Sequence, residues 1–337
     1  MSPRPPLYKT IADALIRDIR TGVYQPGDRL PGHTRLARDQ GVSLITSNRA
    51  LKELERLGFV SRRPREGTFV SPRVRRILVP APGTSKDNRE SPQLFEYLDG
   101  ILTEANQRNI DVAVTPYESA VFASVEALFV GNFHGIIQLG AAGPSFPASV
   151  LQQSNIPWLS VGVEEGLGRY FANEDRRSAA REIVQLMRQD GCQRIGFVGR
   201  LNFPNHRLCR DGYLDAMADT TLGSSLVRDV STPTVLPVVE ELVPKIDGLI
   251  VAGGGIMSCM ALAYLRGQQN DIPIGVFDES ADIEEFRDQV YFAEMDHVES
   301  GRHAVRMLTD IIGASDDVAT HARLPCKVTR PTHSPIR

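Results

Sequence analysis

The sequence predicts two folds in one chain: a small helical domain that ends in a β-hairpin, and a larger α/β body with parallel sheets. In roughly the first 60 residues, apolar side chains recur at spacings of three and four, the period of a helix. Beyond residue 76, short apolar runs alternate with amphipathic segments, which is the rhythm of parallel α/β units. With 337 residues, 42% of them apolar, the chain is long enough for two or three domains with separate cores.

Charge is divided unevenly along the chain. Residues 1–76 contain 16 Lys and Arg against 7 Asp and Glu, whereas the rest contains 22 against 34. The overall charge of −3 therefore conceals a head of +9 on a body of −12. Because basic segments bind polyanions with release of counterions, this asymmetry indicates a nucleic-acid partner.

The first predicted helix spans residues 7–20 and ends at Gly22. Its inward face is formed by Leu7, Ile11, Leu15 and Ile19. A turn over residues 24–28 then leads into the stretch from Leu30 to Val70. That stretch predicts two short helices, a third, longer helix and a basic hairpin.

Glycines divide the stretch, with Gly41 ending a short helix and Gly58 ending the longest one. The inward positions are Leu36, Ala37, Val42, Ile45, Ala50, Leu51, Leu54 and Leu57. Strands over 59–63 and 68–71, joined by the turn 64–67, complete a winged helix-turn-helix. Such a unit places its second helix in the major groove and a basic appendage on phosphate. The candidate DNA contacts are Arg35, Ser43, Thr46, Asn48, Arg49, Lys52, Arg62, Arg63, Arg65, Gly67 and Thr68. The alternative, an amphipathic helix with a solvated charged face, is disfavoured by the charge division.

Residues 6–70 resemble the DNA-binding domain of the GntR family. The matching motifs are Pro6-Leu7-Tyr8, Gly22 to Pro31, Leu36-Ala37, Val42-Ser43 with Thr46, Ala50-Leu51 with Leu54-Glu55 and Gly58, and Arg62-Arg63 with Gly67 to Val70. The resemblance implies binding to double-stranded DNA. Four positions depart from the family pattern, namely Thr34, Leu44, Asn48 and Arg65. The family's usual operator half-site therefore cannot be transferred to this chain.

A short basic segment, residues 72–76, is the predicted linker between the head (1–71) and the body (77–337). The body begins with a strand at 77–79 and a loop at 80–92, followed by a helix marked by Leu94, Leu98, Ile101, Leu102 and Ala105. Further strands are predicted at 111–114, 134–139, 157–161, 194–198, 226–230, 248–252 and 274–277. Helices are predicted at 119–130, 149–153, 176–189, 207–218 and 257–266.

The body resembles the effector domain of LacI/GalR regulators. The motifs are Phe133 to Ile137, Asn155-Ile156-Pro157, Asn173-Glu174-Asp175, Gly191 to Gly199, Gly212-Tyr213 with Ala216, Asp247 to Ile250, Ile272-Pro273 with Gly275 to Asp278, Gly301 with Ala304, and Leu324-Pro325 with Arg330. The resemblance implies a two-lobed, periplasmic-binding-protein-like (type I) fold. Its first lobe would cover about 77–163 and 296–320, and its second about 164–295 and 321–337.

A GntR-type head on a LacI-type body resembles the AraR type of bacterial arabinose repressor. This resemblance implies a homodimeric, ligand-responsive transcriptional regulator, in the usual case a repressor of sugar or related carbon-source genes. A small molecule between the two lobes, a sugar or sugar derivative, would change its affinity for the operator. Whether the ligand releases or promotes DNA binding is not visible in the sequence.

The resemblance also implies effector-binding positions. The strongest is Asp278, whose alternative role is a helix cap; Arg207, beside the family's arginine position, could instead be a solvated arginine at a helix start. That arginine position is itself Cys209, and Gly253–Gly255 replaces polar family residues. The full set of candidates is Asp278, Arg207, Cys209, Phe203, Gln138, Glu164 and Asp296.

Other classes of protein are disfavoured. No apolar N-terminal segment and no run of about 18 apolar residues occurs, so a cytoplasmic location is expected. The four cysteines form no paired motif, so neither a disulfide framework nor a zinc site is indicated. No metal and no cofactor are expected. Nucleophile-elbow, phosphate-loop and HExxH motifs are missing, so an enzyme is not expected. Two alternatives stay open: a constitutive DNA-binding regulator with a degenerate cleft, and an α/β enzyme that acts on a sugar.

Overall fold

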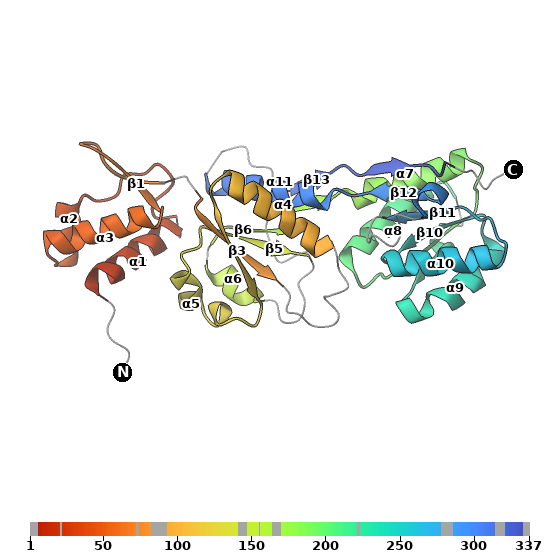
Figure 1. Ribbon diagram of the computed structural model, residues 1–337, viewed down its shortest axis with the longest axis horizontal. Coiled ribbons are helices and arrows are strands. Elements are labelled where there is room, and N and C mark those ends of the chain that lie inside the picture. Colours follow the sequence, from red (N-terminus) through yellow and green to blue (C-terminus); the bar gives the residue numbers. More distant parts are fainter. Residues whose placement is uncertain are drawn as a thin grey trace.

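A computed structural model describes residues 6–20, 22–71, 74–81, 93–140, 147–154, 156–163, 170–220, 223–277, 286–313 and 321–332. A helical head and two α/β lobes follow one another along the long axis (Figure 1). Most of the predicted loop at 80–92 lies outside the described residues, as do Glu164 and Asp278. In the described ranges, no helix is long and apolar enough to cross a membrane.

The head has three helices and a two-stranded antiparallel hairpin. These elements are α1 (Leu7–Arg20), α2 (His33–Gln40), α3 (Leu44–Arg56), β1 (Val60–Arg63) and β2 (Gly67–Val70). The stretch from Leu30 to Val70 contains only two of the helices, so the prediction of three within it was wrong. The third is α1, which precedes the stretch and packs against α3.

Left-handed backbone conformations mark the ends of the head's elements, as the glycine pattern predicted. Gly41 ends α2 with φ 63°, and Gly58 follows α3 with φ 84°. Arg65, in the hairpin turn, has φ 66° although it is not glycine. The position where the family has a glycine has therefore kept the glycine-like conformation, at some cost in backbone strain.

Two inward positions of the head were predicted wrongly. Leu7 is 57% exposed, and Ile45 is 81% exposed. In α3 the buried place is taken by Ser47, whose hydroxyl lies 2.8 Å from the His33 carbonyl oxygen and 3.0 Å from that of Leu44. Because its polar group is satisfied, Ser47 can be buried beside Ala50 and Leu51, and the helix rotates Ile45 outward.

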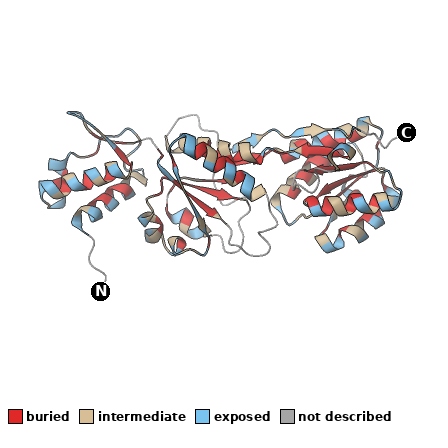
Figure 2. Ribbon diagram, viewed as in Figure 1, coloured by how far each residue is buried: buried red, intermediate tan, exposed pale blue. Residues whose placement is uncertain are grey.

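The first lobe is built on a six-stranded parallel sheet in the order β13-β7-β6-β5-β3-β4. Its strands are β3 (Arg76–Ala81), β4 (Asp111–Pro116), β5 (Gly135–Leu139), β6 (Trp158–Val161), β7 (Phe171–Glu174) and β13 (His321–Leu324). Helices α4 (Gln93–Gln107) and α11 (His297–Ile312) pack on one face, and α5 (Val125–Val130) and α6 (Ala148–Ser154) on the other. Both faces are thus buried, as a parallel sheet requires (Figure 2).

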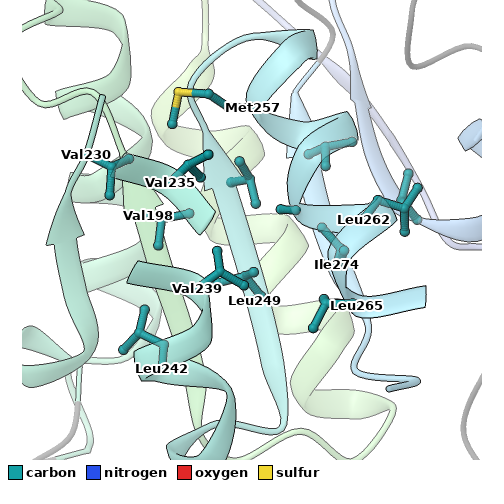
Figure 3. Close-up of a cluster of buried hydrophobic side chains, with 14 of the residues drawn as sticks. Val198, Val230, Val235, Val239, Leu242, Leu249, Met257, Leu262, Leu265 and Ile274 are labelled. Carbon is teal, nitrogen blue, oxygen red and sulfur yellow. The ribbon is translucent and has the colours of Figure 1, made fainter. Parts of the chain in front are cut away.

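The second lobe repeats this plan with the strand order β14-β12-β11-β10-β8-β9, in which only β14 is antiparallel to its neighbour. Its strands are β8 (Ile195–Gly199), β9 (Val227–Asp229), β10 (Gly248–Ala252), β11 (Ile274–Phe277), β12 (Tyr291–Glu294) and β14 (Lys327–Thr329). Helices α7 (Arg176–Gln189) and α8 (Pro204–Ala216) cover one face. Helices α9 (Val235–Leu242) and α10 (Gly255–Gly267) cover the other, where aliphatic side chains such as Val239, Leu249 and Leu265 interlock (Figure 3).

The predicted fold class is confirmed, with corrections in the body. The helix predicted at 119–130 is split into a short 3₁₀ turn, Ala120–Phe122, and α5. Strands β7 and β13 pair within the first sheet, although 164–174 and 321–324 were expected in the second lobe. Leu102, expected to face inward from α4, is 43% exposed. Val74, in the expected linker, is buried in the core of the first lobe.

Candidate DNA interface and effector site

The start of α3 carries two hydroxyl groups that are paired with each other. The Ser43 hydroxyl caps the helix by accepting from the backbone N–H of Thr46, and lies 2.8 Å from the Thr46 hydroxyl. This cap fixes the start of the helix and removes an unsatisfied donor there. Lys52, two turns further along, is exposed.

Two candidate readers on α3 have partners within the head. Arg62, on the hairpin, donates from Nη2 to Oδ1 of Asn48 at 3.1 Å. The guanidinium of Arg49 lies over the ring of Tyr8 in α1, 4.1 Å from its centroid. These contacts join the hairpin and α1 to α3, and no pattern in the sequence indicated either of them.

The remaining basic candidates lie on α2 and on the hairpin. Arg35 is exposed and lies 3.4 Å from Asp39. Arg63 lies over the Phe69 ring and 3.7 Å from Glu66, while Arg65 is exposed at the tip of the turn.

Gly67 and Thr68, the two uncharged candidates of the hairpin, have structural roles. A Cβ on Gly67 would lie 2.7 Å from Nε of Arg29, so this glycine makes room for the Arg29 side chain. Thr68 is buried, and its carbonyl oxygen accepts from the backbone N–H of Leu30. Its contact with DNA stays a prediction.

The head contacts the first lobe directly. Arg20, at the end of α1, donates from Nη2 to the Phe133 carbonyl oxygen at 2.7 Å. Its guanidinium lies 5.2 Å from the centroid of Phe59 in the head and 4.8 Å from that of Phe129 in the lobe. Phe59 stacks on His134. Burial, followed by the repulsion of nearby arginine charge, lowers the pKa of His134 to about 4, so its ring is neutral at pH 7.

Two effector candidates are built into the fold. Cys209 is fully buried in the core beneath α7 and α8, and Gln138 is fully buried at the end of β5. Gln138 donates to the Gly140 carbonyl oxygen and accepts from the Ser160 hydroxyl. Both side chains are part of the protein interior. Their burial contradicts the prediction that they contact a ligand.

The other effector candidates that the structure describes lie at the starts of α8 and α11. Arg207 donates to the Leu201 carbonyl oxygen at 2.9 Å. Phe203 is 40% exposed, with the guanidinium of Arg200 4.7 Å from its ring centroid. Asp296 caps α11 by accepting from the N–H of Glu299. Phe203 and Arg207 lie on one turn at the start of α8, where the backbone N–H of Arg207 donates to the Phe203 carbonyl oxygen.

Two asparagines join the two lobes, and the sequence did not indicate that they interact. Asn205, at the start of α8, donates to the carbonyl oxygen of Gly162 in the first lobe at 2.8 Å. It accepts from the amide of Asn173, at 3.3 Å, in β7. Asn173 belongs to the Asn-Glu-Asp motif, so the sequence singled it out without assigning a contact.

Its neighbour Glu174 is the centre of a buried polar network where the chain passes between the lobes. The carboxylate accepts from the His297 ring at 2.9 Å, the Ser300 hydroxyl at 2.8 Å and the Tyr97 hydroxyl at 3.0 Å. Arg176, the first residue of α7, lies 3.8 Å away. Burial raises the pKa of Glu174, but these hydrogen bonds and charges outweigh burial and lower it to about 2.

Among the described residues, no three His, Cys, Asp or Glu side chains are placed to hold a metal ion. The polar groups at the lobe junction are amides, hydroxyls and one carboxylate network. Groups of this kind recognise ligands through hydrogen bonds.

Residues 7–70 match the model of the gntR family of bacterial regulatory proteins. The chain is 32% identical over 114 residues to the HTH-type transcriptional regulator YdcR of Escherichia coli, covering 34% of this chain and 23% of that protein. It is 39% identical over 66 residues to the histidine utilization repressor of Klebsiella aerogenes, covering 20% of this chain and 27% of that protein. The chain thus spans about a quarter of the length of these relatives.

Solved structures share the fold at low identity. A LacI-family regulatory protein from Chloroflexus aggregans has a TM-score of 0.66 at 16% identity, covering 76% of this chain and 98% of that one. A complex of the transcriptional regulator CelR with cellobiose has a TM-score of 0.63 at 17% identity, covering 98% and 100%. A LacI-family regulator from Enterococcus faecium, with bound ribose, has a TM-score of 0.59 at 16% identity, covering 78% and 100%. The chain therefore joins a GntR-family winged helix-turn-helix head to a body with the fold of LacI-family regulators, the combination found in AraR-type regulators.

Proposed function

We propose that this protein is a ligand-responsive, DNA-binding transcriptional regulator, a homodimeric repressor of genes for the use of a sugar or a related carbon source. The observation that carries the proposal is the direct packing of a winged helix-turn-helix head on one lobe of a two-lobed body, through Arg20 and the Phe59–His134 stack. In the proposed division, the head covers 1–71, the linker 72–76 and the body 77–337.

The proposed operator contact uses the outer face of α3 with the hairpin beside it. Basic side chains on α3 and on the hairpin supply the charge that holds phosphate, and the first turns of α3 reach the base edges. The described candidates with exposed or half-buried side chains are Arg35, Ser43, Thr46, Asn48, Arg49, Lys52, Arg62, Arg63 and Arg65.

The proposed effector site lies between the lobes, near the contact of Asn205 with Gly162. Gly162 and Asn205 follow the carboxyl ends of β6 and β8, and α/β proteins of this kind bind small molecules beyond the carboxyl ends of parallel strands. Arg207, Phe203, Asp296, Asp278 and Glu164 remain the candidates for ligand contact. The CelR complex contains cellobiose and the Enterococcus faecium structure contains ribose, which supports a sugar as the class of ligand.

The proposed switch follows from the packing of the head. A ligand that favours one arrangement of the lobes would reorient the first lobe within a dimer, and the docked head would move with it. The separation of two heads must match half-sites about one helical turn apart, so a small rotation changes operator affinity. The ligand must bind the two arrangements with different affinity for this to occur.

Two measurements on the full-length chain test the proposal. Selection from random DNA should enrich a palindromic site whose binding weakens steeply with salt. A thermal-shift screen of sugars, sugar acids and sugar phosphates should find a stabilising compound that also alters operator affinity. Operator binding without any responsive compound would favour a constitutive regulator. Failure to select any DNA, with turnover of a bound sugar, would favour an enzyme.

A further inference from the structure

Two aliphatic side chains project from the first turn of α3. Leu44 is 53% exposed and Ile45 is 81% exposed. They are adjacent, in the turn that follows the Ser43 cap. In a helix-turn-helix, the N-terminal residues of the recognition helix are the ones that meet base edges. The exposed pair therefore lies where sequence is read, if the proposed DNA interface is correct.

The polar groups around this pair are engaged within the head. The hydroxyls of Ser43 and Thr46 lie within hydrogen-bond distance of each other. Arg49 is drawn back over the ring of Tyr8. Among the described side chains, the outermost groups of this turn are consequently hydrocarbon rather than guanidinium.

Asn48, one turn further along, is restricted in what it can read. Its Oδ1 accepts from Arg62, which has only donors, so this contact fixes the orientation of the amide. The Nδ2 group is left to donate. It can pair with an acceptor such as thymine O4 or a purine N7, and the two-point contact of Asn with adenine would require Oδ1 to accept a second hydrogen bond with its other lone pair.

We infer that Leu44 and Ile45 read the C5-methyl groups of thymines in the major groove of the operator. The thymine methyl is the apolar group that base pairs present in that groove, so it is the complement of an aliphatic pair. Basic side chains beside the pair, on α3 and the hairpin, bind the flanking phosphates and hold the helix in the groove. This inference rests on the proposed DNA-binding function and names part of its specificity.

The test uses full-length protein and the site obtained by selection from random DNA. Each thymine of one half-site is replaced by deoxyuridine, which removes the methyl group and keeps every hydrogen-bonding atom. Binding is followed by fluorescence anisotropy at a fixed salt concentration. We expect one or two positions at which the change weakens binding about fourfold, the loss for one buried methyl group.

Protein variants assign that discrimination to the pair. In Leu44→Ala/Ile45→Ala, thymine and uracil should bind equally at those positions, while the dependence of affinity on salt is unchanged. Leu102→Ala removes a half-exposed leucine in the body and is the matched control; it should keep the preference for thymine. Leu44→Arg should shift the selected base toward guanine, the usual partner of arginine.

The outcomes separate this inference from the function on which it rests. Absence of any selected DNA overturns both. A selected site that binds equally well with uracil at every thymine overturns the inference and leaves the regulator intact. The inference is also overturned if the double variant keeps the thymine preference or changes the oligomeric state measured by light scattering.

Discussion

Phe59 of the head stacks on His134 of the first lobe, with ring centroids 4.3 Å apart and ring planes inclined by 10°. Both side chains are buried, and the guanidinium of Arg20 lies over the rings of Phe59 and Phe129. Aromatic and cation–π contacts of this kind add to the apolar area that the contact buries. The head is consequently held to the body by side chains as well as by the chain that connects them.

Removing Arg20 should release the head. In Arg20→Ala, the hydrogen bond to Phe133 and both ring contacts are lost. We expect a larger radius of gyration by small-angle X-ray scattering and a weakened effector response, with the intrinsic contacts of α3 to DNA retained. Arg38→Ala removes an exposed arginine of α2 that pairs with Asp39 within the head, so it is the control and should leave the radius unchanged. A full effector response in Arg20→Ala would show that this contact does not transmit the signal.

Docking of the head should weaken in acid. The pKa of His134 is lowered from 6.5 to about 4 in the docked state, chiefly by burial. The undocked state therefore binds a proton at a higher pH than the docked state. As pH falls from about 6.5 to about 4, docking loses free energy, up to roughly 3 kcal/mol when both states are protonated. His134→Phe keeps a stacked ring without a titrating group, so scattering should show that its docking varies less with pH over this window. Equal pH dependence in both proteins would exclude His134 as the source.

The buried Glu174 network should stabilise the junction of the lobes. Glu174→Gln leaves His297, Ser300 and Arg176 without their shared carboxylate, and breaking a buried ion pair costs roughly 3–5 kcal/mol. We expect a clear fall in the midpoint of denaturant unfolding at pH 7. Asp215→Asn breaks the exposed pair with Arg177 and should cost far less.

The Glu174 carboxylate should also make the stability of the fold depend on pH. Because its pKa is about 2 in the folded protein against a model value of 4.5, its stabilisation is complete above about 4.5 and is lost as pH falls toward 2. Glu174→Gln should remove that part of the acid sensitivity. If wild type and variant unfold at the same denaturant concentration at pH 7, the network does not stabilise the fold.

The sequence predicted those features that depend on local pattern. Helix α7 and strands β10 and β11 have the bounds that the sequence indicated, since each combines strong periodicity with clear ends. Ile45 was assigned inward because periodicity alone cannot show that Ser47 finds hydrogen-bond partners inside. Strands β7 and β13 were assigned to the wrong lobe, because their pairing is decided by contacts distant in the sequence.

The candidate site was less predictable, because it too depends on contacts between residues distant in the sequence. Cys209 was suggested by the resemblance to a family and Gln138 by its place at a strand end, but the side chains of both are buried in this fold. Glu174 was visible as part of a motif, whereas its partner His297 lies 123 residues away. Phe59 and His134 are 75 residues apart and belong to different folding units. A pattern within one segment cannot reveal either contact.

The close crossing of α4 and α11 should tolerate no added side chain. A Cβ at Gly301 would lie 2.2 Å from the Tyr97 carbonyl oxygen, and one at Gly100 would lie 1.9 Å from that of Val298. Both contacts are with backbone, so Gly301→Ala must separate the helices, at a cost of roughly 1–3 kcal/mol or more. Gly267→Ala is the control, because a Cβ there meets nothing within 4 Å. Calorimetry should show a lower melting temperature for the first change only; equal melting temperatures would mean that the helices can move apart freely.

The contact of Arg62 with Asn48 should contribute to the sequence specificity of DNA binding, whereas the charge of Arg62 should contribute to affinity. Arg62→Ala frees the Asn48 amide to rotate, so the selected half-site should become less strict at the base that Asn48 meets. Loss of one phosphate-binding charge should also reduce the slope of affinity against salt by about 1. Arg63→Ala is the matched change on the same strand, and Arg63 contacts Phe69 and Glu66 rather than α3. It should weaken binding uniformly across sequences, because it leaves the Asn48 amide fixed. Selection of the same strict half-site by both variants would show that Arg62 binds the backbone alone and does not orient Asn48.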